Sequence, residues 1–570
     1  MHYLPAVLLL SGWLMPLHFL PWVSWHSEAL AFFSVFFAAW MGLGRCFRRN
    51  QPCVVALPFL TWPFVALALL ALLQGAIGLI SFGGDALVLA FYAVLCIVCL
   101  TLGYASVQQS EVFRPDASDG RREVQALMCL AVILTIGACV SVFLALTQVL
   151  EVYEQSSWIN QMPDLRRPGG NMGQPNHLAT LVLMGMASLL LLYESRKLTA
   201  LPSALICFVF CVGVAITESR SGLLCFMFLL VWWLLKKRGV GFRLTPLVVA
   251  LTAVGLLATS WAWPFLFGLI KQGVPVGGTM HINAAAGTRL LVWPQLLEAL
   301  MLRPWWGWGL GQVPKAHNAV AHSYAVSEPF SYSHNILLDV ALGVGVPLTV
   351  LVVLVTAVWL RRRVQGVNQL VPWYCLAVCL PVAMQSMLEY PFAYAYFLAP
   401  VMFALGVLEG MAGVRPMLHI GRRAAAVLLL GVTAMVAWSV VEYLLIEEDF
   451  RVARFEALRL GQTPAEYTRP KIFVLTQLDA LLSGARIVPK PGMTADELTL
   501  AEKVALRYPW TATQNRYALS LALNGRTEEA VRQLAIMRAM YGEKRFAPIR
   551  AYWASLGQDK YPQLSDLPLP

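Results

Sequence analysis

The sequence predicts an all-α, polytopic membrane protein with about 13 transmembrane helices, a long outward-facing loop and a C-terminal helical domain. Three observations support this prediction. Of its 570 residues, 58% are hydrophobic and only 13% are charged, whereas a typical soluble domain has about 25% charged residues. Apolar runs of about 20 residues, long enough to cross a bilayer as a helix, recur as far as residue 445. In residues 446–570, by contrast, 31 of 125 side chains are charged, so this part is predicted to lie outside the membrane.

The apolar runs give the predicted spans in chain order. They cover residues 5–22, 29–44, 54–79, 86–106, 125–149, 176–194, 201–217, 222–235, 244–270, 335–359, 370–388, 392–412 and 424–445. No Lys or Arg precedes the first run, and a second run follows it closely. The first run is therefore predicted to be a retained span and not a cleaved signal peptide.

Most Lys and Arg residues before residue 446 lie in six short clusters between apolar runs. The clusters are Arg45/Arg48/Arg49, Arg114/Arg121/Arg122, Arg196/Lys197, Lys236/Lys237/Arg238/Arg243, Arg361/Arg362/Arg363 and Arg415/Arg422/Arg423. If all six are cytoplasmic, every alternate loop is poor in basic residues, as the positive-inside rule requires. We therefore predict a multi-pass protein of the bacterial inner membrane with a cytoplasmic N-terminus. The net charge of +11 then reflects topology, and no nucleic-acid partner is predicted.

Two domains follow from this topology. Residues 1–445 form the predicted transmembrane domain, including the periplasmic loop 271–334, and residues 446–570 form a periplasmic helical-hairpin domain. In the second domain, residues 496–508 and 511–542 are predicted to be helical, with a break at Asn524-Gly525. The stretch 516–530 resembles the helix-turn-helix of a tetratricopeptide repeat. Such a domain could bind a peptide or serve as a structural cap.

Three outward-facing segments carry unusual motifs. The long loop contains Arg289 four residues before Trp293, then Pro304 and a Gly-x-Gly-x-Gly turn at 307–311, and it ends in Ser333-His334-Asn335. A short loop contains Ser219-Arg220-Ser221 between two spans. A third segment reads Gly-Asn-Met-Gly-Gln-Pro-Asn over residues 170–176.

Together these motifs resemble the family of O-antigen ligases, O-antigen polymerases and bacterial protein O-oligosaccharyltransferases, over roughly residues 160–412. The Gly-Asn-x-x-Gln-Pro-Asn signature resembles the pilin-glycosylating protein O-oligosaccharyltransferases in particular. The resemblance implies a glycosyltransferase that moves a preassembled oligosaccharide from undecaprenyl diphosphate to Ser or Thr of an exported protein such as a pilin. An O-antigen ligase acting on lipid A core and an O-antigen polymerase remain alternatives, and a membrane transporter is the non-enzymatic one.

Three residues are candidates for catalysis in such a transfer. Arginine can hold phosphate oxygens with two parallel hydrogen bonds and stays charged, so Arg220 and Arg289 suit a diphosphate. Histidine accepts a proton near neutral pH, so His334 suits a general base or a residue that positions the acceptor. Each also has a structural interpretation: Arg220 could extend to the membrane surface from a helix end, Arg289 could be an ordinary loop residue, and His334-Asn335 could be a helix start with Asn335 as its cap.

Six further residues are predicted to contact substrate. Gln174 and Asn176 belong to the signature segment, Arg167 lies just before it in the same loop, and Asn335 follows the candidate base. Glu389 and Tyr390 lie at the outer end of a helical hairpin, where they could line a sugar site or lie at the membrane interface. Gln174 and its neighbouring Pro175 could also simply begin a helix, because proline is favoured in a first turn.

Several other features bear on the mechanism. Many family members carry a Glu where this chain has Gly343, and Asp339, one turn after Asn335, could replace it. The glycines at 307–311 are predicted to be turn residues that allow close backbone approach. His281, His317 and His322 are predicted to be solvated. The resemblance implies no cofactor and no metal, and the cysteine pairs at 96/99 and 375/379 lack the partner ligands of a zinc site.

Overall fold

The structure is a computed structural model that describes residues 3–48, 54–113, 124–152, 157–161, 167–270 and 284–570. It is predominantly helical, as predicted. The chain forms two compact units. The first unit comprises residues 1–68, 91–277 and 357–437, and the second comprises residues 69–90, 278–356 and 438–570. The predicted domain boundary at residue 446 stays a prediction.

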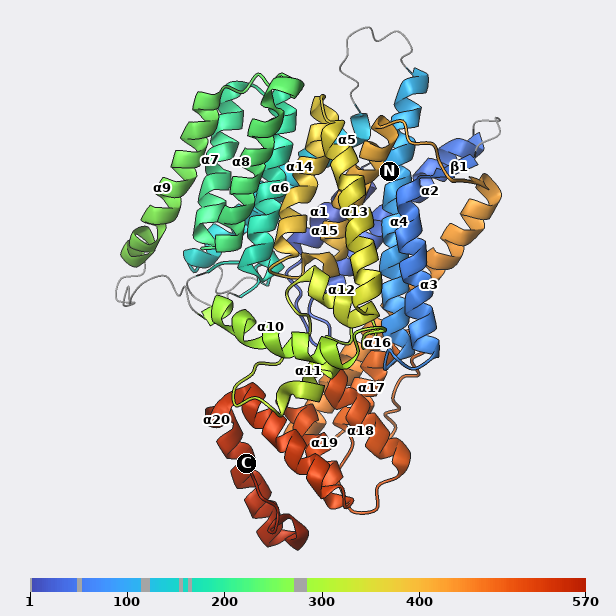
Figure 1. The fold of residues 1–570 in the computed structure, drawn as a ribbon, viewed down its shortest axis with the longest axis vertical. Helices are drawn as coiled ribbons and strands as arrows, with labels where there is room; N and C mark the ends of the chain where they lie inside the picture. The colour runs from blue at the N-terminus through green and yellow to red at the C-terminus, as the bar shows by residue number, and fades with distance from the viewer. Residues whose placement is uncertain (1–2, 49–53, 114–123, 153–156, 162–166, 271–283) are drawn as a thin grey trace. The chain divides into compact units, whose positions relative to one another are not determined.

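The first unit is a bundle of apolar helices. It contains α1 (Leu4–Leu14), α2 (Trp25–Arg48), α5 (Gln125–Val149), α6 (Pro175–Glu194), α7 (Ala200–Ile216), α8 (Arg220–Val240), α9 (Pro246–Ile270), α14 (Leu370–Gln385) and α15 (Ala395–Met411). Most of α4 (Gly83–Phe113) also belongs to it. Helix α6 is the central element, because it packs against α5, α7, α8 and α14, and Figure 1 shows α6, α7, α8 and α9 side by side. Its side chains from Leu178 to Met184 are accordingly fully buried.

Helices occupy all the predicted spans, with three corrections to their extent. Helix α1 ends at Leu14, so the helix predicted over residues 5–22 is too long. The span predicted over 54–79 begins with strand β1 (Val54–Leu57), which pairs antiparallel with β2 (Leu418–Gly421), and continues as α3 (Trp62–Ala76). The span predicted over 335–359 is divided at Gly345 into α12 (Ile336–Val344) and α13 (Val346–Gln365).

Seven helices among the described residues are long and apolar enough to cross a membrane, and four shorter apolar helices accompany them. These properties are those of a membrane protein. The number of about 13 spans stays a prediction.

The second unit combines the predicted outward loop with the C-terminal helices. Its loop part contains α10 (Ala284–Leu302) and α11 (Val313–Ala321), followed by α12 and the start of α13. The C-terminal part contains the end of α16 (Arg422–Leu458), then α17 (Thr476–Ala485), α18 (Ala495–Arg507), α19 (Thr511–Leu523) and α20 (Thr527–Asp559). Short 3-10 turns lie at Phe59–Thr61, Gly170–Met172, Pro391–Ala393 and Pro562–Leu564.

Helices α18 and α19 and the part of α20 before Gly542 form where the sequence predicts helices, whereas α17 and the part of α20 after Gly542 were not predicted. Helix α18 begins with a capping box between Thr494 and Glu497, which satisfies the first backbone N–H groups. Helices α19 and α20 are separated at Asn524-Gly525, where Gly525 has φ +79°. Ala518, Leu534 and Met537 lie in the core between these helices. The resemblance to a tetratricopeptide repeat stays a prediction.

Loop 271–334 is more ordered than the sequence suggested, within the residues that the structure describes. Helices α10, α11 and α12 share a core that includes Val292, Leu296 and Val320. His317 on α11 is fully buried, so the prediction that it is solvated is wrong. Its Nε2 lies 2.9 Å from Gln295 Oε1 and 2.9 Å from Ser327 Oγ. His322 is exposed as predicted, and His281 lies outside the described residues.

The loop also packs on the C-terminal helices within the second unit. Ala321 at the end of α11 contributes to a small buried cluster with Ile536 and Met540 of α20. The backbone N–H of Ser327 donates a 2.8 Å hydrogen bond to the carbonyl of Ala539. The segment that leads to Ser333-His334-Asn335 is therefore supported from the C-terminal helices.

Candidate functional site

The signature segment of the first unit is held by two buried amides. Asn171 Nδ2 donates to the carbonyls of Leu14 and Trp158, at 2.7 and 2.9 Å. Gln148 of α5 accepts from the N–H of Gly170 at 2.9 Å and donates to its carbonyl at 3.0 Å. Gly170 has φ +57°, a conformation that favours glycine. The first half of the signature therefore serves to shape the loop before α6.

Gln174 and Pro175 begin helix α6. The Gln174 side-chain oxygen accepts a 2.7 Å hydrogen bond from the backbone N–H of His177, and Pro175 occupies the first helical position. Gln174 and Pro175 therefore act as a helix start, which is the structural interpretation given above for this pair. A substrate contact by Gln174 stays a prediction.

Asn176 joins three segments that are far apart in the sequence. Its Nδ2 donates a 2.8 Å hydrogen bond to Glu389 Oε1, and its Oδ1 accepts a 2.8 Å hydrogen bond from Ser219 Oγ. Ser219 also caps α8 by accepting from the N–H of Gly222 at 3.0 Å. Arg220 is the first residue of α8 and is exposed. The hydrogen bonds of Asn176 therefore fix the point from which the Arg220 side chain extends.

Two other predicted residues lie near this junction. Arg167 donates from Nε to the carbonyl of Thr217 at 3.0 Å, just before the Ser219 cap. Tyr390 follows Glu389 and stacks on Tyr394, with ring centroids 5.9 Å apart and an interplanar angle of 24°. The ring of His177 packs edge-on against Tyr394 at 4.6 Å. The first unit thus brings Arg167, Asn176, Arg220, Glu389 and Tyr390 to one region.

In the second unit, Ser333 is the fixed point of the candidate catalytic motif. Its N–H donates to Asp339 Oδ1 at 3.1 Å and its hydroxyl donates to Asp339 Oδ2 at 2.9 Å. Its carbonyl accepts a 2.7 Å hydrogen bond from Trp293 Nε1. Ser333 is fully buried. Trp293 lies one helical turn after Arg289, so Arg289 lies on the same side of α10 as the tryptophan that binds the Ser333 carbonyl.

His334 adopts an unusual backbone conformation. Its φ is +60°, which costs energy for any residue with a Cβ and is held only where the surroundings impose it. Ser333 imposes it on one side, and on the other side Asn335 Oδ1 caps α12 by accepting from the N–H groups of Leu337 and Leu338. The His334 ring lies 4.8 Å from the ring of Phe330. Asn335 is thus a helix cap, as its structural interpretation held, and its contact with substrate stays a prediction.

The glycine turn allows close backbone approach, as predicted. Gly307, Gly309 and Gly311 all have positive φ. A Cβ on Gly307 would lie 2.5 Å from the carbonyl oxygen of Leu342. A Cβ on Gly343 would lie 2.9 Å from Leu310 Cδ2 and 3.2 Å from its Cα. A side chain at position 343 would therefore require Leu310 and the turn to move.

The predicted site residues thus fall into two groups. Arg167, Gln174, Asn176, Arg220, Glu389 and Tyr390 lie in the first unit, and Arg289, His334 and Asn335 lie in the second. Sequence reasoning missed Gln148, Asn171 and Ser219 as residues that hold the site. A polar residue in an apolar run, such as Gln148, is the signal that could have found it. In the part of the chain that the structure describes, no group of three His, Cys, Asp or Glu side chains is placed to hold a metal.

Comparisons with known proteins match three successive parts of the chain to related families. A family described as protein glycosylation ligase matches residues 168–193, and the O-antigen ligase family matches residues 205–353. A family described as virulence factor membrane-bound polymerase, C-terminal, matches residues 373–554.

Two curated proteins of Acinetobacter baylyi are similar to this chain. One, named general O-oligosaccharyltransferase, is 26% identical over 94% of this chain and 92% of its own length. The other, named ComP-specific O-oligosaccharyltransferase, is 28% identical over 47% of this chain and 49% of its own length. The first similarity extends over both units, including the C-terminal helices.

Proposed function

We propose that this chain is a protein O-oligosaccharyltransferase. The proposal starts from the resemblance to O-antigen ligases and protein O-oligosaccharyltransferases, which these comparisons confirm. The chain moves a preassembled oligosaccharide en bloc from a lipid-linked donor to a Ser or Thr hydroxyl of an exported protein. The observation that carries this proposal is the signature segment at 170–176, which matches the protein glycosylation ligase family and connects through Asn176 to Glu389 and to the start of α8.

The donor is undecaprenyl diphosphate bearing the glycan, and the acceptor is a pilin-like protein. In the reaction, the acceptor oxygen forms a bond to the anomeric carbon while the bond from that carbon to the diphosphate oxygen breaks. The bonding electrons leave with the diphosphate, and the hydroxyl proton passes to the base. Arg220 and Arg289 hold the departing diphosphate, whose charge grows in the transition state. His334 takes the proton.

The remaining predicted residues support this chemistry. Asn176 and Glu389 position the Ser219-Arg220 turn, and Arg167 holds the backbone before it. Gln174, Tyr390 and Asn335 contact donor or acceptor. The transmembrane domain comprises residues 1–445 with about 13 spans in the bacterial inner membrane, and residues 446–570 lie in the periplasm. No cofactor and no metal take part.

Two experiments test the assignment. The chain is expressed in cells that hold a lipid-linked glycan pool and a pilin-like acceptor, and the acceptor is examined by mass spectrometry. An acceptor of unchanged mass together with glycan on lipid A core would assign the chain to the O-antigen ligases, and extended glycan on the lipid would assign it to the polymerases. The variant His334→Ala at normal protein level is expected to leave the acceptor unmodified. Transfer by that variant at the unaltered rate would remove His334 from the mechanism, whereas loss of transfer in a folded variant would disfavour the transporter alternative.

The Asn176 junction can be tested by exchange of its hydrogen-bonding partners. Asn176→Asp removes the donor to Glu389 and sets two carboxylates side by side, so transfer should fall at least tenfold. Adding Glu389→Gln restores a donor and acceptor pair at the same place. Recovery of transfer in the double variant is the expected result, whereas equal loss in the single and double variants would show that Asn176 acts by some other contact.

A further inference from the structure

We propose that α10 and the turn after it lie on the outer surface of the membrane and insert an apolar stripe into the lipid. The stripe, which we call the α10 stripe, consists of Leu290, Pro294, Leu297, Met301, Trp305 and Trp306. The assignment of this surface to the outer leaflet rests on the proposed function and its topology. The partner is the lipid of that leaflet, so this part of the loop is bound to the membrane and not suspended in the periplasm.

Helix α10 is apolar on both of its faces. Val292, Leu296 and Ala299 are fully buried in the core of the second unit. On the opposite face Leu290 is 71% exposed and Met301 is 68% exposed. The members of the stripe on α10 follow one another at intervals of three or four residues, which places them along one side of a helix. A helix at a water-facing surface carries polar residues on its outer face, so this face requires a nonpolar partner.

The stripe ends in two exposed tryptophans. Trp305 is 70% exposed and Trp306 is 80% exposed. Tryptophan is enriched at the boundary between lipid and water, because its ring is apolar and its N–H can still be hydrated. An in-plane helix that carries leucine and tryptophan on one face is the usual form of an interfacial membrane helix. The composition of the stripe therefore favours a lipid surface over a soluble protein partner.

A backbone hydrogen bond holds the Trp305-Trp306 turn at the first residue of α13, a helix that exposes apolar side chains. The N–H of Val346, the first residue of α13, donates a 2.7 Å hydrogen bond to the carbonyl of Pro304. Helix α13 then exposes apolar side chains on all sides, among them Val350 at 50%, Leu351 at 56% and Leu354 at 58%. A helix that is hydrophobic all round is surrounded by lipid when it is not buried in protein. The turn is thus attached where a lipid-facing helix begins.

Residues 69–77 of the same unit also expose apolar side chains, and they are hydrogen-bonded to the glycine turn at 307–311 that follows Trp306. Gln74 of α3 donates to the carbonyl of Gly343 at 3.0 Å and accepts from the N–H of Leu310 at 2.8 Å. Beside it, Leu69 and Ile77 are each 63% exposed. The turn that follows α10 is therefore hydrogen-bonded to two segments that expose apolar side chains. This attachment to lipid-facing segments is the reason to assign the bilayer, and not an acceptor protein, as the partner.

The placement has a consequence for the proposed reaction. Arg289 precedes the first member of the stripe by one residue, so an α10 that lies in the membrane surface holds Arg289 at the height of the lipid head groups. The diphosphate of a lipid-linked donor lies at that same height. Membrane contact by α10 would then present the donor's diphosphate to Arg289 without lifting the lipid from the bilayer.

Photocrosslinking tests the membrane contact without any donor. The full chain, with the benzophenone amino acid p-benzoylphenylalanine incorporated in place of Leu297, is reconstituted in vesicles of phosphatidylethanolamine and phosphatidylglycerol and irradiated. Position 350 on α13 is the positive control, and position 528, an exposed Glu of α20, is the negative control. Lipid adducts at 297 and 350 but not at 528 are expected by mass spectrometry. Adducts at 350 alone, or crosslinks from 297 only to protein, would overturn the proposal.

A kinetic measurement separates this proposal from the proposed function. The variant Leu297→Glu/Met301→Glu should raise the KM for the lipid-linked donor about tenfold and leave the KM for the acceptor unchanged, since it disturbs only the membrane side. Val488→Glu, at a site 70% exposed in the segment between α17 and α18, is the matched control and should change neither. Lipid adducts at 297 in a chain with no transferase activity would support the membrane contact and reject the proposed function. An unchanged donor KM in the Leu297/Met301 variant would overturn the link from α10 to the donor.

Discussion

At the scale of single residues, Asp339 is the side chain that holds the candidate base in place. Both of its carboxylate oxygens accept hydrogen bonds from Ser333, and Ser333 directly precedes His334, whose positive φ needs such support. That Asp339 replaces the Glu expected from the resemblance stays a prediction. Asp339 is a positioning residue that acts through the backbone.

Asp339→Asn should lower the transfer rate at least tenfold at unchanged protein level. An amide can accept only one of the two hydrogen bonds from Ser333, so the His334 ring loses its fixed direction, and small displacements of a catalytic group cost rate steeply. The kcat and KM for a lipid-linked donor and a peptide acceptor check this, with Asp566→Asn at an exposed C-terminal site as control. A fall in thermal stability with unaltered kcat would assign Asp339 a purely structural role.

At the scale of elements, His317 links α10, α11 and the segment before the catalytic motif. Burial lowers its pKa from 6.5 to about 4, so the ring is neutral in the folded protein. Below pH 6.5 the unfolded chain binds a proton that the folded chain does not, and stability therefore decreases as the pH falls from about 6.5 towards 4. The total loss over that window is about 3 kcal/mol.

Thermal unfolding of the detergent-solubilised chain between pH 7.5 and 5 checks this dependence. The unfolding temperature is expected to fall on acidification, and His317→Gln should flatten part of that fall because glutamine does not titrate. His322→Gln, at an exposed site on the same loop, should leave the pH dependence as it is in the unaltered chain. Identical pH profiles for the His317 variant and the unaltered chain would contradict the assignment.

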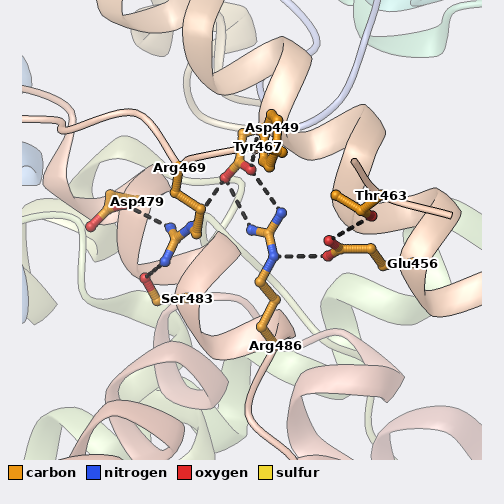
Figure 2. Close-up of polar contacts among 8 residues, drawn as sticks. All are labelled: Asp449, Glu456, Thr463, Tyr467, Arg469, Asp479, Ser483 and Arg486. Carbon is orange, nitrogen blue, oxygen red and sulfur yellow. Dashed lines mark hydrogen bonds and ion pairs between the residues drawn. The ribbon is translucent and has the colours of Figure 1, made fainter. Parts of the chain in front are cut away.

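A second element-scale feature is the ion-pair network at the end of α16, drawn in Figure 2. Asp449, which is only 1% exposed, binds Arg486 through both oxygens at 2.7 and 3.0 Å. Tyr467 donates to the same carboxylate at 2.8 Å, and Arg469 lies 3.4 Å from it. The network joins the segment 467–486 to the last turns of α16. The first part of the C-terminal region is therefore held against the end of α16 by ion pairs and hydrogen bonds.

Asp449→Ala should destabilise the second unit by about 2 kcal/mol, because it removes the buried carboxylate that accepts hydrogen bonds from Arg486, Arg469 and Tyr467. The neighbouring Glu448→Ala is the matched control. Glu448 pairs with Arg451 at the surface, with both side chains more than half exposed, and such pairs contribute about 0–1 kcal/mol. Limited proteolysis of membrane-embedded protein should cleave the Asp449 variant within residues 460–490 much sooner. Equal cleavage rates in both variants would show that the network has no such role.

At the scale of the whole molecule, residues 69–90 belong to the same compact unit as the C-terminal helices, although about 350 residues separate them in the chain. The N–H of Gly84 donates to Thr476 Oγ1 at 2.8 Å, and Asp85 pairs with Arg507 at 2.9 Å. Upstream, Glu442 of α16 accepts from the N–H groups of Val474 and Leu475, at 2.9 and 3.0 Å. The start of α17 is therefore held by both α4 and α16.

Gly84→Ala tests this packing with a neighbouring control. A Cβ at Gly84 would lie 2.7 Å from both the Thr476 N and the Val474 carbonyl oxygen, whereas a Cβ at Gly83 would meet no atom within 4 Å. Gly84→Ala should therefore lower the unfolding temperature by several degrees and reduce transfer, and Gly83→Ala should be neutral or slightly stabilising. Differential scanning fluorimetry in detergent measures both. Equal behaviour of the two variants would contradict the close packing at Gly84.

The sequence by itself determined the helical class, the approximate position of most apolar helices and the motifs at 170–176, 219–221 and 333–335. These are local properties, since hydrophobic run length, capping residues such as Asn335 and turn glycines such as Gly307 act within a few residues. The roles of Gln174-Pro175 and Asn335 at helix starts could likewise be predicted from capping preferences alone.

Only the tertiary structure decided what depends on distant partners. The hydrogen bond between Asn176 and Glu389 joins residues 213 positions apart, and the burial of His317 depends on Gln295 and Ser327 from neighbouring segments. Helices α10 and α11 formed within a predicted loop because their inner faces found a shared core. A local pattern cannot state whether such a core exists, since its stability comes from surfaces that meet only in the folded chain.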